Sequence, residues 1–436
     1  MAPGLVNSAS HTIIAAMDSP YPVAARGVGA RWPMVGAAMA VLAVVVASGA
    51  WVAAQRPPTA RAGFSSERLM RVTQLIERRI AAREIPGAIT LVARKGRVVH
   101  FDTRGVIAMD STTPVTRDTL FNLASMTKPV TAVAILMMVE AGRIQLADPV
   151  SRYIPQFKDL MVGGPDTSRE KANRSITIRD LLTHTSGLIS PLRTPNPPTK
   201  TLGEFIPTLG VEPLEFQPGT QWVYSNTVAF DTLARIVEIV SGQTYDQFLR
   251  DRIFLPLGMK STAHRLDGAA ASRLATRYDV TPAGLRVRES PDSTIYFAGG
   301  WGLTSTADDY FRFAQMLLNK GELEGVRIVS PRAIELMSSV HVPATMPGRQ
   351  PGEGFGLGVR VITDPAARAT FLSKGSYGWS GAAGTHFWVD PEEEIVAILM
   401  VQAPAVNLRQ DFETAVMQAL MNQSEPPPRA REGRAY

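Results

Sequence analysis

The sequence predicts an α+β fold, in which an antiparallel sheet is flanked by terminal helices and a mostly helical subdomain is inserted. Strand patterns stand near both ends of the chain, at 87–105 and 354–402, and the helical period dominates between them, from about 120 to 330. No internal repeat interrupts this order. We therefore expect one sheet built from about 85–110 and 350–405, with helices packed against it.

The first two elements follow from their side-chain periods. Ser65 to Glu84 is amphipathic at the helical period, and Ser65 or Ser66 can cap the helix. The segment 87–105, GAITLVARKGRVVHFDTRG, alternates apolar and polar residues on both sides of Lys95-Gly96. This alternation about a lysine–glycine pair predicts a β-hairpin.

The later elements are read in the same way. Helices are expected over the run after Ser125 and over 177–184, 230–242 and 307–321. Strands are expected at 354–362, 384–390 and 394–402, and a last helix at 408–422. Glycine and proline punctuate the segments between them.

Composition excludes several functional classes. The 436 residues include no cysteine, which removes disulfides, thiolate nucleophiles and cysteine-based zinc sites. The six histidines are scattered without an H-E-x-x-H pattern, so no metal site is expected. The net charge of +6 comes from basic residues that mostly alternate with acids, as in 77–84, which indicates a solvated surface and not a nucleic-acid partner.

The N-terminal part contains one long uncharged apolar segment, 34–54, after an N-terminal extension over 1–33. Its length suits a membrane anchor, and its small-residue ending suits a cleaved signal peptide. Both interpretations place the remainder of the chain outside the cytoplasm, as a periplasmic, secreted or membrane-anchored protein. A linker is expected at 55–64 and a disordered tail at 426–436.

Ser125 and Lys128 stand three residues apart at the start of an apolar run, FNLASMTKPVTAVAILMMVEAG. Residues at this spacing share one face of a helix, so the two side chains meet. Free N–H groups at a helix N-terminus can stabilise negative charge that develops near the serine oxygen, and the lysine can accept the hydroxyl proton. The S-x-x-K pattern also arises by chance, as a capping serine followed by a surface lysine.

Two more segments contain residues suited to catalysis. In Tyr224-Ser225-Asn226, a tyrosine beside a cation can relay protons, and an asparagine can orient a lysine or a substrate carbonyl. The glycine-rich segment GSYGWSGAAGTHFWVDP, at 375–391, lets backbone N–H groups come close to a ligand. Each segment also has a structural interpretation, as a helix cap and as a β-bulge or tight turn.

In this order, SMTK, YSN and WSG resemble the S-x-x-K, Y-x-N and K-T-G or H-T-G motifs of class C β-lactamase-like serine hydrolases, which share their fold with penicillin-binding peptidases. Further segments match in collinear order: LLTHTSGL, EAGRIQLADPVSRYIPQF, LPLGMKST and GGWGLTSTADDY. The resemblance covers about 65–420 and implies one hydrolase domain over 65–425. In the third motif, WSG followed by AAGT is similar to family VIII carboxylesterases, which act on short acyl esters.

The resemblance implies acyl transfer in two steps, without a metal or cofactor. It implies that Ser125 attacks the carbonyl, that Lys128 and Tyr224 share the general-base work, and that the backbone N–H groups of Ser125 and Ala382 form the oxyanion hole. The implied substrate-contacting positions are Asn226, Trp379, Ser380 and Gly381. Asn226 would also steady Lys128.

The third motif predicts a small uncharged ester as substrate. Trp379 offers an apolar face and one N–H donor where β-lactamases and D-Ala peptidases hold a substrate carboxylate with a cation. Two alternatives remain: a β-lactamase or D-amino-acid peptidase in which Arg360 or Lys374 replaces that cation, and a non-catalytic binding protein. Ser380 lies in a near-copy of the G-x-S-x-G elbow, but a strand follows it, so it is not the expected nucleophile. His184 is expected to hold a loop.

Overall fold

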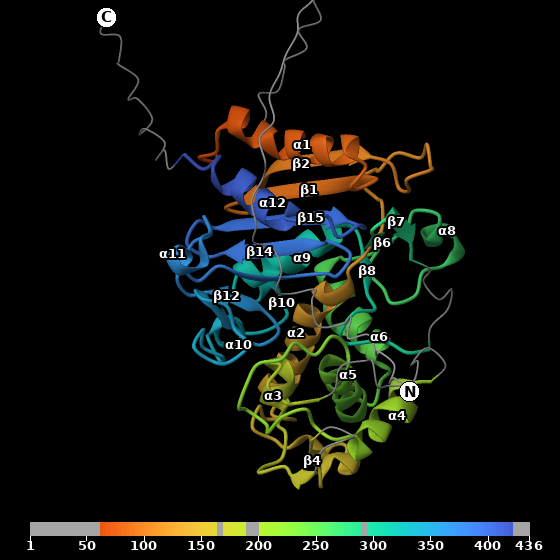
Figure 1. Ribbon diagram of the computed structural model, residues 1–436, viewed down its shortest axis with the longest axis vertical. Helices are drawn as coiled ribbons and strands as arrows, with labels where there is room; N and C mark the ends of the chain where they lie inside the picture. Colours follow the sequence, from red (N-terminus) through yellow and green to blue (C-terminus); the bar gives the residue numbers. More distant parts are fainter. Residues whose placement is uncertain (1–61, 164–168, 189–199, 289–294, 422–436) are drawn as a thin grey trace, which may run out of the picture. The chain divides into compact units, whose positions relative to one another are not determined.

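A seven-stranded antiparallel sheet, in the order β11-β12-β13-β14-β15-β1-β2, forms the centre of the fold in the computed structural model (Figure 1). The structure describes residues 62–163, 169–188, 200–288 and 295–421. The strands are β1 (Gly87–Arg94), β2 (Arg97–Gly105), β11 (Glu353–Phe355), β12 (Arg360–Ile362), β13 (Tyr377–Ser380), β14 (His386–Asp390) and β15 (Ile395–Val401). Strands from 87–105 and from 353–401 therefore meet in one sheet, which confirms the predicted α+β class.

The β1–β2 hairpin turns at the predicted pair. Lys95 and Gly96 have φ angles of 51° and 72°, the left-handed conformation that a tight two-residue hairpin requires. On its other side β1 pairs with β15, from Ala88 opposite Val401 to Arg94 opposite Ile395. Every residue of β1 is buried, because both faces of this strand are covered.

Two hydrophobic clusters cover the two faces of the sheet. On one face, α1 (Ser66–Ala81) and α12 (Leu408–Met417) pack on side chains such as Trp388 and Leu399. On the opposite face, the larger cluster joins Phe387 of β14 to the helical region. Ser65 caps α1 by accepting a hydrogen bond from a backbone N–H, as predicted.

The inserted region is mostly helical. Its α-helices are α2 (Thr127–Glu140), α3 (Ile178–Leu182), α4 (Leu202–Phe205), α5 (Val228–Ser241), α6 (Tyr245–Leu249), α7 (Leu255–Leu257), α8 (Gly268–Ala271) and α9 (Ala307–Leu318). α10 (Pro331–Ser338) and α11 (Pro365–Arg368) follow, and a short 3-10 helix, η2 (Ala124–Met126), precedes α2. Four two-stranded pairs add β3–β8 (Phe121–Asn122, Thr304–Ser305), β4–β5 (Met161–Val162, Glu170–Lys171), β6–β7 (Tyr278–Thr281, Gly284–Val287) and β9–β10 (Glu322–Leu323, Val326–Arg327).

The structure differs from the sequence predictions at two elements. The segment 354–362 is not one strand, because Gly358, at φ 76°, turns the chain so that β11 and β12 pair as a hairpin. The last helix ends at Met417 and not near 422.

The predictions for 1–33, 34–54, most of 55–64 and 426–436 fall on residues outside the described ranges. Among the residues that the structure describes, no helix has the length and apolarity that crossing a bilayer requires.

Candidate active site

Ser125 lies in η2, where the chain enters α2, and only 9% of its surface is exposed. The preceding residue, Ala124, has φ 46°, a conformation that is costly for a residue with a side chain. Neighbouring elements hold this turn in place: the Thr385 hydroxyl donates to Leu123 O at 3.1 Å, and the Tyr310 hydroxyl donates to Met126 O at 2.9 Å. The serine is therefore presented by a fixed and strained turn.

Lys128, one turn along α2, is fully buried and held at three points. Its Nζ lies 3.2 Å from Ser125 Oγ and donates to Asn226 O at 2.6 Å and Gly300 O at 2.9 Å. The two carbonyls fix the nitrogen within hydrogen-bond distance of the serine hydroxyl. A group that exchanges a proton with Ser125 needs this placement.

A buried carboxylate binds the main chain next to one of these carbonyls. Asp231 of α5 accepts hydrogen bonds from the Gly300 N–H and from the Tyr296 hydroxyl, both at 2.9 Å. Burial raises the pKa of Asp231 to about 6, against the effect of these hydrogen bonds and of Lys128. Asp231 thus holds the main chain at the N–H of Gly300, and the carbonyl of the same residue accepts from the amine.

Tyr224 reaches the same place from the loop before α5. Lys128 Nζ lies 4.9 Å from the centre of its ring, and its hydroxyl accepts a hydrogen bond from Trp379 Nε1 at 3.3 Å. Within the described residues, no hydrogen bond joins Tyr224 to Ser125. The second and third motifs therefore meet through the tyrosine and tryptophan, while the lysine contacts the serine directly.

His184 holds the segment that carries Tyr224. Its Nδ1 accepts from the Ser225 N–H at 3.1 Å, its carbonyl accepts from the Val223 N–H at 3.1 Å, and its ring lies 4.6 Å from the Tyr224 ring. Burial, with Lys128 as a second cause, holds the pKa of His184 well below its ordinary value, so the ring is neutral. This matches the expectation that His184 holds a loop.

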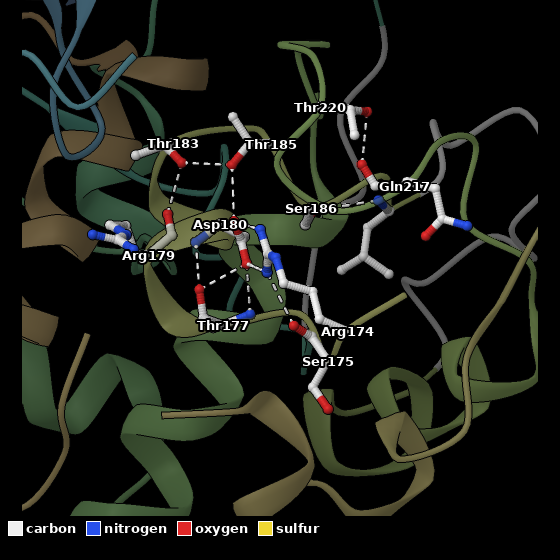
Figure 2. Close-up of polar contacts among 11 residues, drawn as sticks. Arg174, Ser175, Thr177, Arg179, Asp180, Thr183, Thr185, Ser186, Gln217 and Thr220 are labelled. Carbon is white, nitrogen blue, oxygen red and sulfur yellow. Dashed lines mark hydrogen bonds and ion pairs between the residues drawn. The ribbon is translucent and has the colours of Figure 1, made fainter. Parts of the chain in front are cut away.

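A polar network around Asp180 and Thr185 is shown in Figure 2. It anchors the turn that contains His184, where the Thr185 N–H donates to Asp180 O. Asp180 of α3 accepts two hydrogen bonds from Arg174, at 2.6 and 3.0 Å, and others from the Thr177 N–H, the Thr177 hydroxyl and the Thr185 hydroxyl. His184 itself has φ 58°, in the left-handed region. The buried carboxylate thus secures a strained turn directly beside the site.

We expect Asp180→Asn to lower the free energy of unfolding by about 2–4 kcal/mol at pH 7, because it removes the charge of a buried carboxylate that accepts five hydrogen bonds. Burial acts to raise the pKa of Asp180, but Arg174 and Thr177 outweigh it and lower the pKa below its ordinary value of 3.8. A lowered carboxyl pKa contributes stability above the unfolded-state pKa, and this contribution is lost as the pH falls through the folded-state pKa.

Urea unfolding at pH 7 and pH 3 tests this expectation. The difference between wild type and Asp180→Asn should shrink at pH 3. The control is Asp159→Asn, which changes an aspartate whose side chain is 71% exposed and should cost under about 1 kcal/mol. A difference that is equal at both pH values would contradict the role given to the ionised carboxylate.

The third motif, Trp379-Ser380-Gly381, lies at the end of β13, beside the turn that carries Ser125. Trp379 is half-buried, and its ring centre lies 5.4 Å from that of Tyr224 and 5.2 Å from that of Phe355. A side chain at Gly381 would meet Leu123 O at 2.4 Å, so only glycine allows this approach. The N–H of Ala382, next in the chain, has no acceptor among the described residues. It is free to bind a ligand oxygen.

Asn226 differs from the expected role. Its contact with Lys128 is made by the main-chain oxygen, and its exposed side chain has no hydrogen-bond partner within the described part of the chain. Holding the lysine therefore does not need an asparagine at this position.

Sequence reasoning missed Asp231 and Gly300. The segment GGWGLTSTADDY matched the family, but nothing in it indicated that a glycine carbonyl would meet the lysine. In the described ranges, no cluster of three or more histidine, aspartate or glutamate side chains could hold a metal ion.

The chain has clear relatives. The profile of the Beta-lactamase family matches residues 72–419. The chain belongs to this family. Its members are serine hydrolases, and the match spans both the sheet strands and the helical region described above.

Two relatives and one solved structure show the range of similarity. Protein Rv1367c of Mycobacterium tuberculosis is 33% identical over 347 residues, covering 73% of this chain and 86% of the relative. Esterase EstB of Burkholderia gladioli is 29% identical over 374 residues, covering 78% and 91%. The structure of EstCE1, a hydrolase with promiscuous acyltransferase activity, aligns with a TM-score of 0.70 at 27% identity, covering 81% of this chain and 99% of that one. These similarities support a family VIII-like carboxylesterase relationship.

Proposed function

We propose that this serine hydrolase cleaves short-chain, uncharged carboxylic esters through an acyl-enzyme on Ser125. Lys128 takes the hydroxyl proton as Ser125 Oγ attacks the ester carbonyl, since the amine lies 3.2 Å from that oxygen. The N–H groups of Ser125 and Ala382 stabilise the oxyanion. Tyr224 returns a proton to the leaving alcohol, and water then hydrolyses the acyl-enzyme.

The environment of Trp379 is the observation that supports uncharged esters as the substrate class. Its only donor, the indole N–H, is used by the Tyr224 hydroxyl, and its ring lies among aromatic side chains. A carboxylate placed against this surface would lose water and gain no ion pair, whereas an uncharged ester loses little.

We infer that neither Arg360 nor Lys374 replaces the cation that holds a substrate carboxylate in β-lactamases. Arg360 is committed inside the protein, where it donates to Glu413 at 2.7 Å and lies 3.6 Å from Glu353. Lys374 precedes the first residue of β13, whereas the serine turn lies beyond its last. The esterase names of EstB and EstCE1's description as a hydrolase agree with this proposal.

One observation favours a second function, hydrolysis of carboxylate-bearing β-lactams or D-alanyl peptides. Arg409, in the first turn of α12, is exposed, and it has no hydrogen bond or ion pair within the described residues. It stands four residues before Glu413 and so shares its helix face. If this second function is the true one, Arg409→Ala should remove lactam turnover and leave ester turnover.

A substrate panel decides between the two functions. We expect p-nitrophenyl acetate and butyrate to be turned over at least 100-fold faster, in kcat/KM, than nitrocefin. Nitrocefin turnover as fast as ester turnover would reject the proposal.

Trp379→His should raise nitrocefin turnover relative to p-nitrophenyl butyrate by about threefold or more at pH 6, because a protonated imidazole adds a cation where the indole stood. The ratio of the two activities is its own control for enzyme concentration and folding. A ratio that does not change would count against the role given to Trp379.

A further inference from the structure

A chain of hydrogen bonds runs from the third motif into α12. Ser380 Oγ lies 2.8 Å from His386 Nδ1, and His386 Nε2 lies 2.9 Å from Glu413 Oε1. Arg360 donates to the same Glu413 oxygen at 2.7 Å. The register of β13 and β14 places Ser380 directly opposite His386. His386 is 1% exposed, whereas Ser380 is half-buried and borders the site.

The charge of Glu413 fixes where the protons lie. Burial acts to raise its pKa, but Arg360 and His386 outweigh burial and hold the pKa well below its ordinary value. Ionised Glu413 can only accept, so the proton of a neutral His386 ring sits on Nε2. Burial also lowers the pKa of His386, against the effect of Glu413, so the ring is neutral at neutral pH. Its Nδ1 is then an acceptor, and the Ser380 hydroxyl must donate to it.

We propose that the relay Arg360–Glu413–His386–Ser380 sets the polarity of Ser380, so that the hydroxyl offers acceptor lone pairs to the substrate and not a proton. A serine hydroxyl has one proton, and in this relay the Ser380 hydroxyl directs it at His386 Nδ1, 2.8 Å away. The remaining lone pairs repel a substrate carboxylate and accept from a substrate N–H or O–H. The inference rests on the proposed function and refines its substrate: an uncharged ester, preferably with a hydrogen-bond donor near the scissile group.

The position of Ser380 makes this polarity relevant to binding. The residue before it, Trp379, contacts Tyr224, and the residue after it, Gly381, packs against the carbonyl of Leu123 in the serine turn. Ser380 therefore sits between two parts of the site. With the indole N–H and the serine proton both in use, β13 itself has no side-chain donor left for an anion at this end. The cation that remains is on α12, where Arg409 is close enough for its charge to act on His386 and Tyr224.

A matched pair of substrates tests the polarity. Phenyl butyrate and 3-carboxyphenyl butyrate differ by one carboxylate on the leaving phenol, and the measured quantity is the ratio of their kcat/KM values, charged over neutral. We expect Ser380→Ala to raise this ratio at least twofold, because it removes lone pairs that repel the carboxylate. A donating serine would make the ratio fall, and a fall or no change would overturn the proposal.

Glu413→Gln tests the relay behind the serine. Without the fixed charge, the proton of His386 can move to Nδ1, which frees the Ser380 hydroxyl to donate. We expect this variant to raise the ratio about threefold or more. In a Ser380→Ala background, Glu413→Gln should change the ratio less than 1.5-fold. An equal rise in both backgrounds would show a general charge effect and overturn the relay.

The tautomer of His386 can be read without any enzyme activity. In protein labelled with ¹⁵N-histidine, long-range ¹H–¹⁵N correlation should show an unprotonated Nδ1 and a protonated Nε2 at neutral pH, assigned with His386→Gln. A protonated Nδ1 would overturn the relay even if the esters are hydrolysed. If no ester is turned over, the proposed function fails while the tautomer still decides the relay, and the same spectrum decides it if Glu413→Gln does not fold.

Discussion

Ser125→Ala is expected to lower kcat for p-nitrophenyl butyrate at least about 1,000-fold, because the attacking oxygen is removed and no other group can form the acyl-enzyme. Among the residues that the structure describes, the one side-chain hydrogen-bond partner of this oxygen is Lys128 Nζ at 3.2 Å. The lysine keeps its two main-chain acceptors in the variant, so the fold should be retained. Steady-state rates, with circular dichroism and thermal unfolding as checks of the fold, measure both parts of this expectation.

The control and the labelling experiment make the assignment specific. Ser272→Ala, at an exposed serine whose hydroxyl donates to Ala269 O, should keep wild-type activity. A fluorophosphonate probe should label the wild-type protein on the peptide that contains Ser125 and should not label Ser125→Ala. Label found on Ser380, or residual activity within tenfold of wild type, would refute the assignment.

The sequence predicted the fold well because its signals were local. The Lys95-Gly96 pair between two alternating runs specifies a hairpin by itself, and Ser65 specifies a helix start. The prediction of one strand over 354–362 was wrong. Apolar and glycine residues alternate along this segment as in a strand, but the positive φ of Gly358 turns the chain between β11 and β12. A turn without a distinctive residue pair is hard to separate from a glycine-rich strand.

The site was predictable only in part, because the sequence shows local contacts and not contacts between distant segments. Ser125 and Lys128 share one helix turn, so their spacing alone brings them together. The contacts of Lys128 with the carbonyls of Asn226 and Gly300 join segments about 100 and 170 residues away, and main-chain oxygens leave no trace in residue identity. The same holds for Ser380, whose partner His386 is near in sequence but whose polarity depends on the distant Glu413.

Lys128→Met should lower kcat about 10²–10⁴-fold, the range expected for removing a positioned general base. Methionine keeps much of the volume of the buried side chain and removes the amine that faces Ser125 Oγ. It leaves the carbonyls of Asn226 and Gly300 without their donor, so thermal unfolding must be measured alongside the rate. Lys374→Met, at an exposed lysine that precedes β13, is the matched control and should keep full activity.

A second substitution separates base catalysis from charge alone. Arginine retains a positive charge and can donate to both carbonyls, but a guanidinium does not give up its proton in proteins, so it cannot take one from Ser125. If Lys128 acts as the base, Lys128→Arg should be as inactive as Lys128→Met wherever it folds. If Lys128 only supplies positive charge to the site, arginine should restore most of the rate, and the assignment of the amine as the group that receives the serine proton would be wrong.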